Sequence, residues 1–475
     1  MFTRMRLPAV FRPFCLACGL TACTVGPVYQ TPSPAAPERY AAPLPLASSG
    51  VAADMGWWAS FDDPLLAELI AEARRGSPEL DQALARIAQA RALVASARGG
   101  AMPSLALDAS SLRGKAGVAP GISVLSTSSS AGLDASWEID LYGGLRKSAD
   151  AAQARLDARV ADWHGAQASL AAEVANAYIG QRACEATVLV LAQDSASREQ
   201  TARLTAQKIQ AGLGSQADGM LIDASSADGR QRLVAQRAEC DLNIKALVAL
   251  TGIAEAPLRS RLAAGADHLG HALPKPAAFT VPANALTQRP DIAAAERELA
   301  AASADINVAQ ANRYPRLSLS GNIGATALNG VSGTTVGWSF GPSLSLPLFD
   351  GGRRRAGVEQ ARARFDEADA TYRSKVRGAV REIEEALVRL DAADRRETDA
   401  DAAARGYERY LHVSADKFNA GSGDLFELED ARRTALASRQ TVIALRRERL
   451  AAWIALYKAV GGGWSDAATT SPSST

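Results

Sequence analysis

The feature that most constrains the fold is a long segment, residues 348–461, that contains no proline and is typical of helix except at one pair of glycines. The pattern stops and restarts at Gly421-Ser422-Gly423-Asp424, where glycine can end one helix and Ser422 or Asp424 can cap the next. The segment therefore predicts a long helical hairpin that turns at Gly421 and Gly423. Five apolar residues step through its first arm by four and three positions, as in a coiled-coil seam: Val376, Val380, Ile383, Leu387 and Leu390.

An earlier part of the chain repeats this hairpin. Glu173 corresponds to Glu382, and the turn glycines Gly212 and Gly214 correspond to Gly421 and Gly423, always 209 positions apart. Before each hairpin, two prolines (Pro78 and Pro103, Pro290 and Pro315) bracket another helical segment and the start of a strand. Repetition over such a length predicts a duplicated architecture. In the first copy, the helix after Pro78 has its apolar positions at Leu80, Leu84, Ile87 and Leu93.

The repeat sets the expected domain boundaries. We expect the first repeat at 77–255 and the second at 289–463, each a helix, two strands and a long helical hairpin. Residues 23–76 should form an extended segment and a short helix, because prolines and small residues dominate until Trp57 and Trp58. Residues 256–288 are expected to be a coil connector, and residues 464–475 a disordered tail.

The N-terminus reads as a lipoprotein signal peptide, residues 1–22. Arg4, Arg6 and Arg12 give a positive region, and a short apolar stretch ends at Leu20-Thr21-Ala22-Cys23. Cys23 is then the lipidated (palmitate-bearing) first residue of the mature chain, and Thr24 after it does not favour retention at the inner membrane. The alternative is an ordinary signal peptide with an incidental cysteine.

Cys184 and Cys240 are the two cysteines that remain in the body of the mature chain. They lie almost equally far from the predicted turn at Gly212, so antiparallel helices would bring them to the same height. Export places the protein in an oxidising compartment, which favours a disulfide. Two unrelated buried thiols remain the alternative, because sequence does not fix which way each helix faces.

Four segments alternate apolar and polar residues with the period of a β-strand. The first two are Ser104–Leu112 and Leu133–Leu141, and their counterparts begin at Leu317 and Val336. Gly- and Ser-rich stretches, 114–130 and 325–335, should be the hairpin loops. A single such strand would fit a soluble sheet with one buried face. Four of them in an exported lipoprotein favour a transmembrane β-barrel, which four strands cannot close, so the chain should oligomerise.

Composition and motifs exclude several function classes. A formal net charge of +1 gives no reason to expect nucleic acid as a partner. We expect no metal or other cofactor, because His268 and His271 lack a cysteine or acidic residue at ligand spacing. Gly461-Gly462-Gly463 lacks the lysine of a phosphate loop and is a simple helix end. No catalytic motif is recognisable, so we expect no enzyme.

Five stretches carry a resemblance to a known family. They are CTVGPVYQTP from Cys23, WWASFDDPLL from Trp57, SWEIDLYGGLR from Ser136, RPDIAAAERELAAA with YPRLSLSGNIG from Arg289, and SLPLFDGGRRRA from Ser345. In this order they resemble the TolC-type outer-membrane efflux proteins, in the lipoprotein branch that serves RND pumps. The resemblance covers most of the mature chain.

The resemblance implies the fold and the function. The fold is mainly α with a transmembrane β part: long helical hairpins form an α-barrel, and four strands per chain contribute to a twelve-stranded β-barrel of a homotrimer. It implies an exit duct in the outer membrane and its lipid, with a large periplasmic part that docks to a periplasmic adaptor and an inner-membrane RND pump. A type I protein-secretion duct and a non-conducting coiled-coil lipoprotein are the alternatives.

The same resemblance points to candidate gate residues. Glu427 and Asp430 match the positions of an inward-facing acidic ring at the periplasmic constriction, with Asp218 at the corresponding place in the first hairpin. The alternative is that these carboxylates only favour a helix N-terminus. Phe418 stands where the family has a tyrosine in a hydrogen-bonded lock at the tips, so this chain should lack that contact.

Overall fold

The structure is a computed structural model that describes residues 25–33, 40–42, 58, 61–119, 122–264, 286, 288–329, 333–462 and 464. The expected signal peptide, the lipidated Cys23, His268 and His271, most of the connector and the tail after Trp464 lie outside these residues. The chain divides into two compact units. The first comprises the described parts of 1–29, 93–152 and 301–365, and the second those of 30–92, 153–300 and 366–475.

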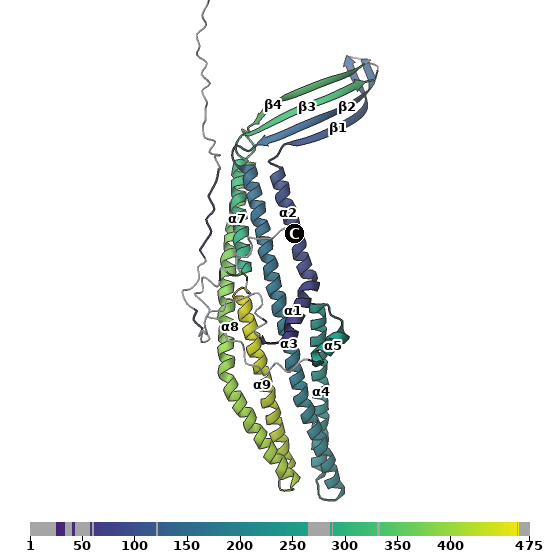
Figure 1. Cartoon of the computed structure of the whole chain (residues 1–475), viewed down its shortest axis with the longest axis vertical. Coiled ribbons are helices and arrows are strands. Elements are labelled where there is room, and N and C mark those ends of the chain that lie inside the picture. The colour runs from purple at the N-terminus through teal and green to yellow at the C-terminus, as the bar shows by residue number, and fades with distance from the viewer. Residues whose placement is uncertain are drawn as a thin grey trace, which may run out of the picture. The chain divides into compact units, whose positions relative to one another are not determined.

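The first unit is built on one antiparallel sheet of four strands (Figure 1). Its order follows the sequence: β1 (Ser104–Ala119), β2 (Ile122–Ile139), β3 (Arg316–Leu328) and β4 (Thr334–Ser345). The central pair joins the two repeats, with Leu133 of β2 opposite Ile323 of β3. β1 and β4 are the edges of the sheet, and each is hydrogen-bonded to one neighbour within the chain.

The strands are longer than the alternation predicted, and the predicted first loop was wrong. Residues 114–119 and 122–130 continue the ladder, with Gly114 opposite Ser126. Hydroxyl pairs between the strands, Ser110 with Ser130 at 2.9 Å and Ser111 with Ser129 at 3.0 Å, supply cross-strand bonds in place of apolar contacts. Serine-rich sequence therefore formed strand here, where composition alone suggested a loop.

The helices reproduce the repeat in their lengths. α2 (Pro78–Gly99) and α7 (Pro290–Ala311) each have 22 residues, and α3 (Gly144–Gln210) and α8 (Arg353–Asn419) each have 67. The returning arms α4 (Gln216–Thr251) and α9 (Leu425–Ala459) have 36 and 35. α3 pairs with α4 and α8 with α9 as antiparallel hairpins (Figure 1). None of the helices that the structure describes combines the length and the apolar character needed to cross a membrane.

Two further helices complete the second unit. α1 (Pro64–Gly76) begins at Asp63, whose carboxylate accepts from the amides of Leu65 and Leu66. α5 (Glu255–Ala264) occupies the start of the connector, which had been expected to be coil. Pro257 does not prevent this helix, because it lies in the first turn, where its missing amide hydrogen costs no helical bond.

An aspartate precedes each of the two long helices, in the segment that leads from the strand to the helix. The carboxylate of Asp140 accepts from the amide of Arg146 at 2.9 Å, and that of Asp350 accepts from the amides of Gly352 and Arg354. The same carboxylates form ion pairs with the side chains of Arg146 and Arg354, at 3.4 and 3.8 Å. Cations in a first helical turn are unfavourable to the helix dipole, and these aspartates offset that cost.

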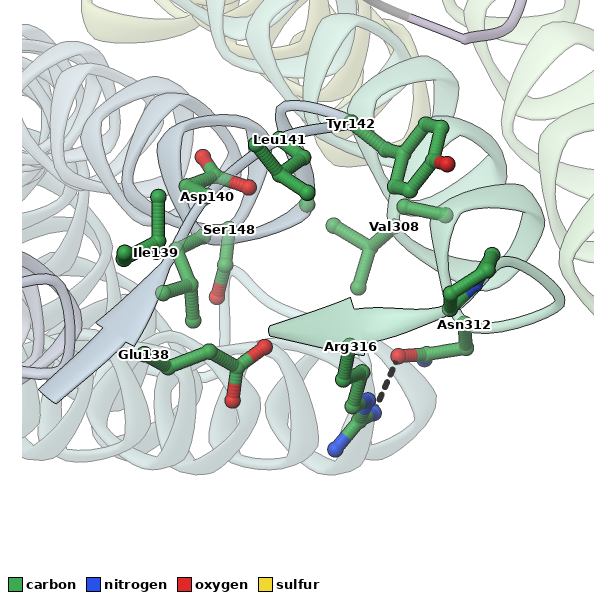
Figure 2. A pocket seen from close by; sticks show the side chains of 13 residues that line it. Glu138, Ile139, Asp140, Leu141, Tyr142, Ser148, Val308, Asn312 and Arg316 are labelled. Atoms are coloured by element: carbon green, nitrogen blue, oxygen red, sulfur yellow. Dashed lines mark hydrogen bonds between the residues drawn. The ribbon is translucent and has the colours of Figure 1, made fainter. Parts of the chain in front are cut away.

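Next to Asp140, β2 turns into α3 beside the junction of α7 and β3. The rings of Tyr142 and Tyr314 stack with centroids 4.7 Å apart, and the Arg316 guanidinium donates to the side-chain Oδ1 of Asn312 at 2.6 Å. The residues around this junction line a pocket of about 150 Å³ (Figure 2). The stacked tyrosines and the paired aspartate fix the change from strand to helix.

The helical unit has two apolar cores, one for each repeat. In the first, α1, α3, α4 and α5 surround Tyr178, whose hydroxyl donates to Asp63 at 2.7 Å. In the second, α8 and α9 pack around Trp453, and the seam predicted from sequence is buried apart from the half-buried Val380. The prediction for α2 was wrong at two positions: Leu84 and Leu93 are 48% and 64% exposed. Its buried side is instead made by Leu80, Ala83, Ile87, Ala90 and Val94.

Candidate functional site at the hairpin tips

Both hairpins turn through the same glycine geometry. Gly212 and Gly421 each have a φ of +75°, in the left-handed region that side chains disfavour. After each of them, an amide returns to a carbonyl five residues back, from Leu213 to Lys208 at 2.8 Å and from Ser422 to Lys417 at 3.0 Å. Gly214 and Gly423 are also needed as glycines, because a Cβ at either position would lie within about 3 Å of the end of the preceding helix. The four glycines therefore set two tight turns, as the repeat predicted.

A small apolar cluster joins the two tips. Ile222 of α4 packs with Phe418 of α8 and with Leu425 and Leu428 of α9, and all four are buried. Lys208 of α3 lies 4.3 Å from the centroid of the Phe418 ring and donates to the Phe418 carbonyl at 3.4 Å. Phe418 has no hydroxyl to donate, so its ring face and backbone make this contact in place of a side-chain hydrogen bond.

Further along the helices from the tips, a largely buried carboxylate holds the hairpins together. Glu429 of α9 accepts from Arg198 of α3 at 2.6 Å and from Ser225 of α4 at 2.5 Å. Its other oxygen accepts from Arg432 at 2.7 Å. Side chains of Arg198, Glu429 and Arg432 are only 9%, 13% and 5% exposed. We call these residues with Ser225 the Glu429 cluster.

Asp194 balances the charge of this cluster. Arg198 also donates to Asp194 at 2.8 Å, so two guanidinium groups face two carboxylates. Arg432 extends the contact to α3 through the hydroxyls of Ser197 and Thr201, at 2.9 and 2.6 Å. Burial disfavours the charged form of Arg198, but the hydrogen bond and charge of Asp194 and the charge of Glu429 outweigh it, so the pKa of Arg198 is raised. The Glu429 cluster therefore keeps its charges and joins the two repeats through α3, α4 and α9.

The candidate gate carboxylates lie close to this cluster but outside it. Glu427 turns toward α8, where it accepts from Ser414 at 3.3 Å and Lys417 at 3.5 Å. Asp430 forms an ion pair with Arg433 one turn further along α9, at 2.5 Å. Asp218 is half-buried in the first turn of α4. Both second-hairpin candidates thus have a cation of the same chain beside them, which the sequence pattern did not predict.

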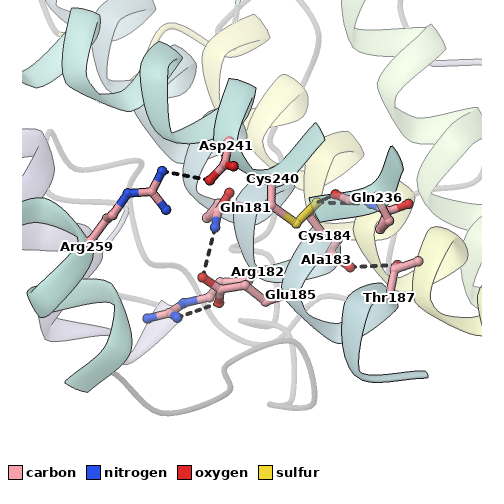
Figure 3. The surroundings of a disulfide bond; sticks show 10 residues. All are labelled: Gln181, Arg182, Ala183, Cys184, Glu185, Thr187, Gln236, Cys240, Asp241 and Arg259. Atoms are coloured by element: carbon pink, nitrogen blue, oxygen red, sulfur yellow. Dashed lines mark hydrogen bonds and ion pairs between the residues drawn. A yellow bond between two sulfur atoms is a disulfide. The ribbon is translucent and has the colours of Figure 1, made fainter. Parts of the chain in front are cut away.

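Each hairpin is braced along its length by different chemistry. In the first, the Sγ atoms of Cys184 on α3 and Cys240 on α4 form a disulfide with Cα atoms 5.6 Å apart (Figure 3). Gln236 donates to the sulfur of Cys184 at 3.0 Å. In the second, ion pairs cross between α8 and α9: Arg396 with Glu448, Glu408 with Arg439, and Arg446 and Arg449 with Glu397.

Other kinds of site are not indicated in the described part of the chain. It contains no group of three or more histidine, cysteine or acidic residues that could hold a metal ion. A groove of about 510 Å³ beside the disulfide is lined by α3, α4 and α5, and its Arg259 is already paired with Asp241 at 2.7 Å. At the hairpin tips, by contrast, a glycine turn that occurs in both hairpins lies close to a largely buried group of charges.

Comparison with known proteins identifies the family. A profile of the outer membrane efflux protein family matches residues 69–253 and 281–462, most of both repeats. The chain belongs to the outer membrane efflux protein family. One relative is the pyoverdine export outer membrane protein OpmQ of Pseudomonas putida, 31% identical over 470 residues that cover 97% of this chain and 98% of the relative. Another is the cation efflux system protein CusC of Escherichia coli O157:H7, 28% identical over 475 residues that cover 96% and 99%.

The fold of the outer membrane efflux protein family is confirmed in three dimensions. The solved structure of the outer-membrane channel OprN is similar to this chain with a TM-score of 0.83 and 31% sequence identity, and the match covers 93% of this chain and 100% of that one. The predicted TolC-like fold with duplicated hairpins and four antiparallel strands is therefore confirmed.

Reasoning from the sequence missed the Glu429 cluster. In the repeat, Glu429 corresponds to Met220, Arg432 to Asp223 and Arg198 to Tyr407, so none of the three charges recurs with the same sign in the other copy. One signal was available. Arg198 and Arg432 belong to the segments beside the two turns, where charges from different hairpins can meet.

Proposed function

We propose that this protein is the outer-membrane exit duct of a tripartite RND-type efflux system, which passively conducts small molecules delivered by an inner-membrane pump through a periplasmic adaptor. The observation that carries the proposal is the match of both repeats, strands and hairpins included, to outer membrane efflux proteins over nearly the full length. The names of OpmQ and CusC describe export and efflux. No catalytic step is part of the proposal.

The proposed assembly is a homotrimer, anchored in addition by a lipid on Cys23. The free edges of β1 and β4 support it, because open sheet edges are not tolerated in lipid and four strands cannot close a barrel. Three copies supply twelve strands, with β1 of one copy beside β4 of the next. The helical hairpins then form the periplasmic tunnel, and their tips form its far end.

We further propose that the hairpin tips are the gate of this duct. Glu427, Asp430 and Asp218 would line the constriction, and the Glu429 cluster would hold the second hairpin against the first in the resting state. The support is the position of the cluster: a buried, balanced ion pair links α9 to α3 and α4 next to the turns. Opening requires the second hairpin to leave this contact.

Reconstitution tests the function directly. Purified protein in planar bilayers should give discrete trimeric channels, and deleting the gene should sensitise the cell to compounds that its pump exports. Absence of conductance together with no β-signal in circular dichroism would favour a non-conducting coiled-coil lipoprotein. Loss of secretion of a protein substrate, with drug resistance unaffected, would favour a type I secretion duct.

A further inference from the structure

The two faces of the sheet carry different charged residues. Leu107, Leu133, Ile323 and Trp338 are directly opposite one another across the four strands, so they share one face. Because side chains alternate along a strand, every second residue from these belongs to the same face. All strand carboxylates of the described residues have the other parity: Asp108, Asp134 and Glu138.

The apolar face carries just two charged residues in the described strands, and both are cations on β1. They are Arg113 and Lys115, which are opposite Thr127 and Leu125 of β2 and are exposed. None of their neighbours on this face can neutralise them, because the face contains no carboxylate. Two unpaired cations at one end of a face that otherwise carries only uncharged side chains are the feature that needs an explanation.

The register gives their height relative to the apolar rows. A row here is a set of residues directly opposite one another across the strands. The first apolar row contains Ile139, Leu317 and Leu344. The last contains Ala109, Ala131, Ala325 and Val336, eight residues further along β3. At about 3.3 Å per residue and a strand tilt of about 40°, this band is roughly 20 Å tall. The next row carries the hydroxyls of Ser111, Ser129 and Thr334.

Arg113 is in the row after these hydroxyls, and Lys115 in the one beyond. Arg113 is therefore roughly 30 Å above the lowest apolar row. The apolar band of outer-membrane barrels is about 25 Å tall, so Arg113 lies just beyond its upper edge. This end of β1 is the one remote in sequence from the start of α3, so it is the exterior end of the strand when the helices are periplasmic. The cations therefore lie at the headgroup level of the outer leaflet.

We propose that Arg113 and Lys115 bind the phosphate groups of lipid A in the outer leaflet. The inference rests on the proposed function, since it requires these strands to cross the outer membrane with their apolar face toward lipid. A guanidinium group can hold a phosphate through two parallel hydrogen bonds, and a nearby ammonium adds charge. Two residues apart on one strand, the side chains reach the same or adjacent phosphates, and the flanking hydroxyl row accommodates the polar sugar backbone.

The test measures lipid retained by purified trimers. Wild-type protein and the Arg113→Gln/Lys115→Gln double variant are incubated with diphosphorylated lipid A, dephosphorylated lipid A or phosphatidylglycerol, and bound lipid is counted by native mass spectrometry. We expect the double variant to retain roughly tenfold less diphosphorylated lipid A, because each surface cation contributes to binding an anionic headgroup. Dephosphorylated lipid A should be retained equally poorly by both. Asp108→Asn, on the opposite face of the same strand, is the matched control and should retain lipid A like the wild type.

Other outcomes overturn the assignment. Equal retention of diphosphorylated lipid A by the wild type and the double variant would show that the two cations face water and bind no lipid phosphate. If the wild type bound phosphatidylglycerol as tightly as diphosphorylated lipid A and the double variant bound neither, the two cations would recognise any anionic headgroup and not lipid A specifically. If the double variant fails to fold, Arg113→Lys and Lys115→Arg keep both charges and should retain lipid A; failure of both to do so contradicts the proposal.

Conductance separates this proposal from the proposed function. In bilayers without lipid A, the double variant should conduct like the wild type, because the cations lie outside the pore. A wild-type protein that neither trimerises nor conducts would refute the duct itself, whatever its lipid retention.

Discussion

Arg198 of α3 donates a 2.6 Å hydrogen bond to Glu429 of α9, although the two residues are 231 positions apart and belong to different repeats. Ser225 of α4 donates to the same carboxylate oxygen. The contact therefore joins three helices from both hairpins through one oxygen atom. Since neither charge recurs in the other repeat, each hairpin supplies only half of the link.

Breaking this link should open the tips. In Glu429→Gln, the buried guanidinium groups of Arg198 and Arg432 lose an anionic partner, which typically costs about 3 kcal/mol. We expect a higher single-channel conductance and a larger open probability for isolated trimers in planar bilayers. Asp369→Asn is the matched control, because its ion pair with Arg373 lies within α8 and its side chains are 36% and 59% exposed. Identical conductance in the two variants would show that the Glu429 cluster does not restrain the gate.

Asp430 and its partner Arg433 should affect ion selectivity in opposite directions. Asp430→Ala leaves Arg433 uncompensated and should lower cation selectivity, whereas Arg433→Ala frees the carboxylate and should raise it. The reversal potential of trimers in a salt gradient measures both effects. Reversal potentials that shift the same way in both variants, or not at all, would place this pair outside the conducting path.

Removing both candidate gate carboxylates should have a larger effect. Glu427→Ala/Asp430→Ala removes up to six negative charges from a trimer, so cation selectivity and block by multivalent cations from the periplasmic side should both weaken. Current block by a trivalent cation gives the comparison with wild type. If block is unaffected, the two carboxylates serve only as the favourable start of α9.

Reduction of the disulfide should destabilise the first hairpin. Cross-linking Cys184 to Cys240, 56 positions apart, limits the unfolded chain and contributes up to about 4 kcal/mol by loop entropy. We therefore expect a lower thermal unfolding temperature in the presence of a reductant. Cys184→Ser/Cys240→Ser should unfold at that lower temperature with or without reductant. A double variant as stable as the oxidised protein would mean that helix packing alone holds α3 to α4.

Stability should fall in mild acid because of His164. Its Nδ1 is buried with no partner among the described residues, its ring lies 4.9 Å from that of Trp163 and 6.0 Å from that of Trp464, and burial lowers its pKa. A histidine whose pKa is lowered by folding stabilises the fold fully above its unfolded pKa of about 6.5, and this contribution is lost as the pH falls below that value.

Thermal unfolding from pH 8 to pH 5 checks this expectation. His164→Gln should show a smaller decrease in unfolding temperature than wild type. His412→Gln, which alters a side chain 81% exposed beside Asp416, should leave the pH dependence unchanged. The opposite ranking of the two variants would contradict the role given to burial.

Long-range features of the fold were predictable because they rest on periodicity. The α8 seam was correctly predicted, since its members are large and recur every three or four residues. The α2 seam was not, because Ala83 and Ala90 complete it while Leu84 and Leu93 are exposed. Alanine carries little hydrophobic signal, so in an alanine-rich helix the larger side chains do not mark the buried face.

The candidate site was predictable only in its backbone. Gly212 and Gly421 identify the turns because a left-handed residue is costly for other side chains. The Glu429 cluster depends on which side chains meet between two hairpins more than 200 residues apart, and no local pattern encodes that. Glu429 lies in an acidic run with Glu427 and Asp430 at the start of a helix. Three neighbouring carboxylates look alike in sequence, so nothing distinguishes Glu429 as the one that links the hairpins.

The different bracing of the two hairpins bears on the symmetry of the assembly. Six hairpins of nearly equal length would give a trimer an almost sixfold tube, but a covalent brace occurs in one kind and a row of ion pairs in the other. Salt weakens only the second kind. Higher ionic strength should therefore loosen every second hairpin and leave the disulfide-braced ones in place, so the mouth of the tube should widen with threefold symmetry.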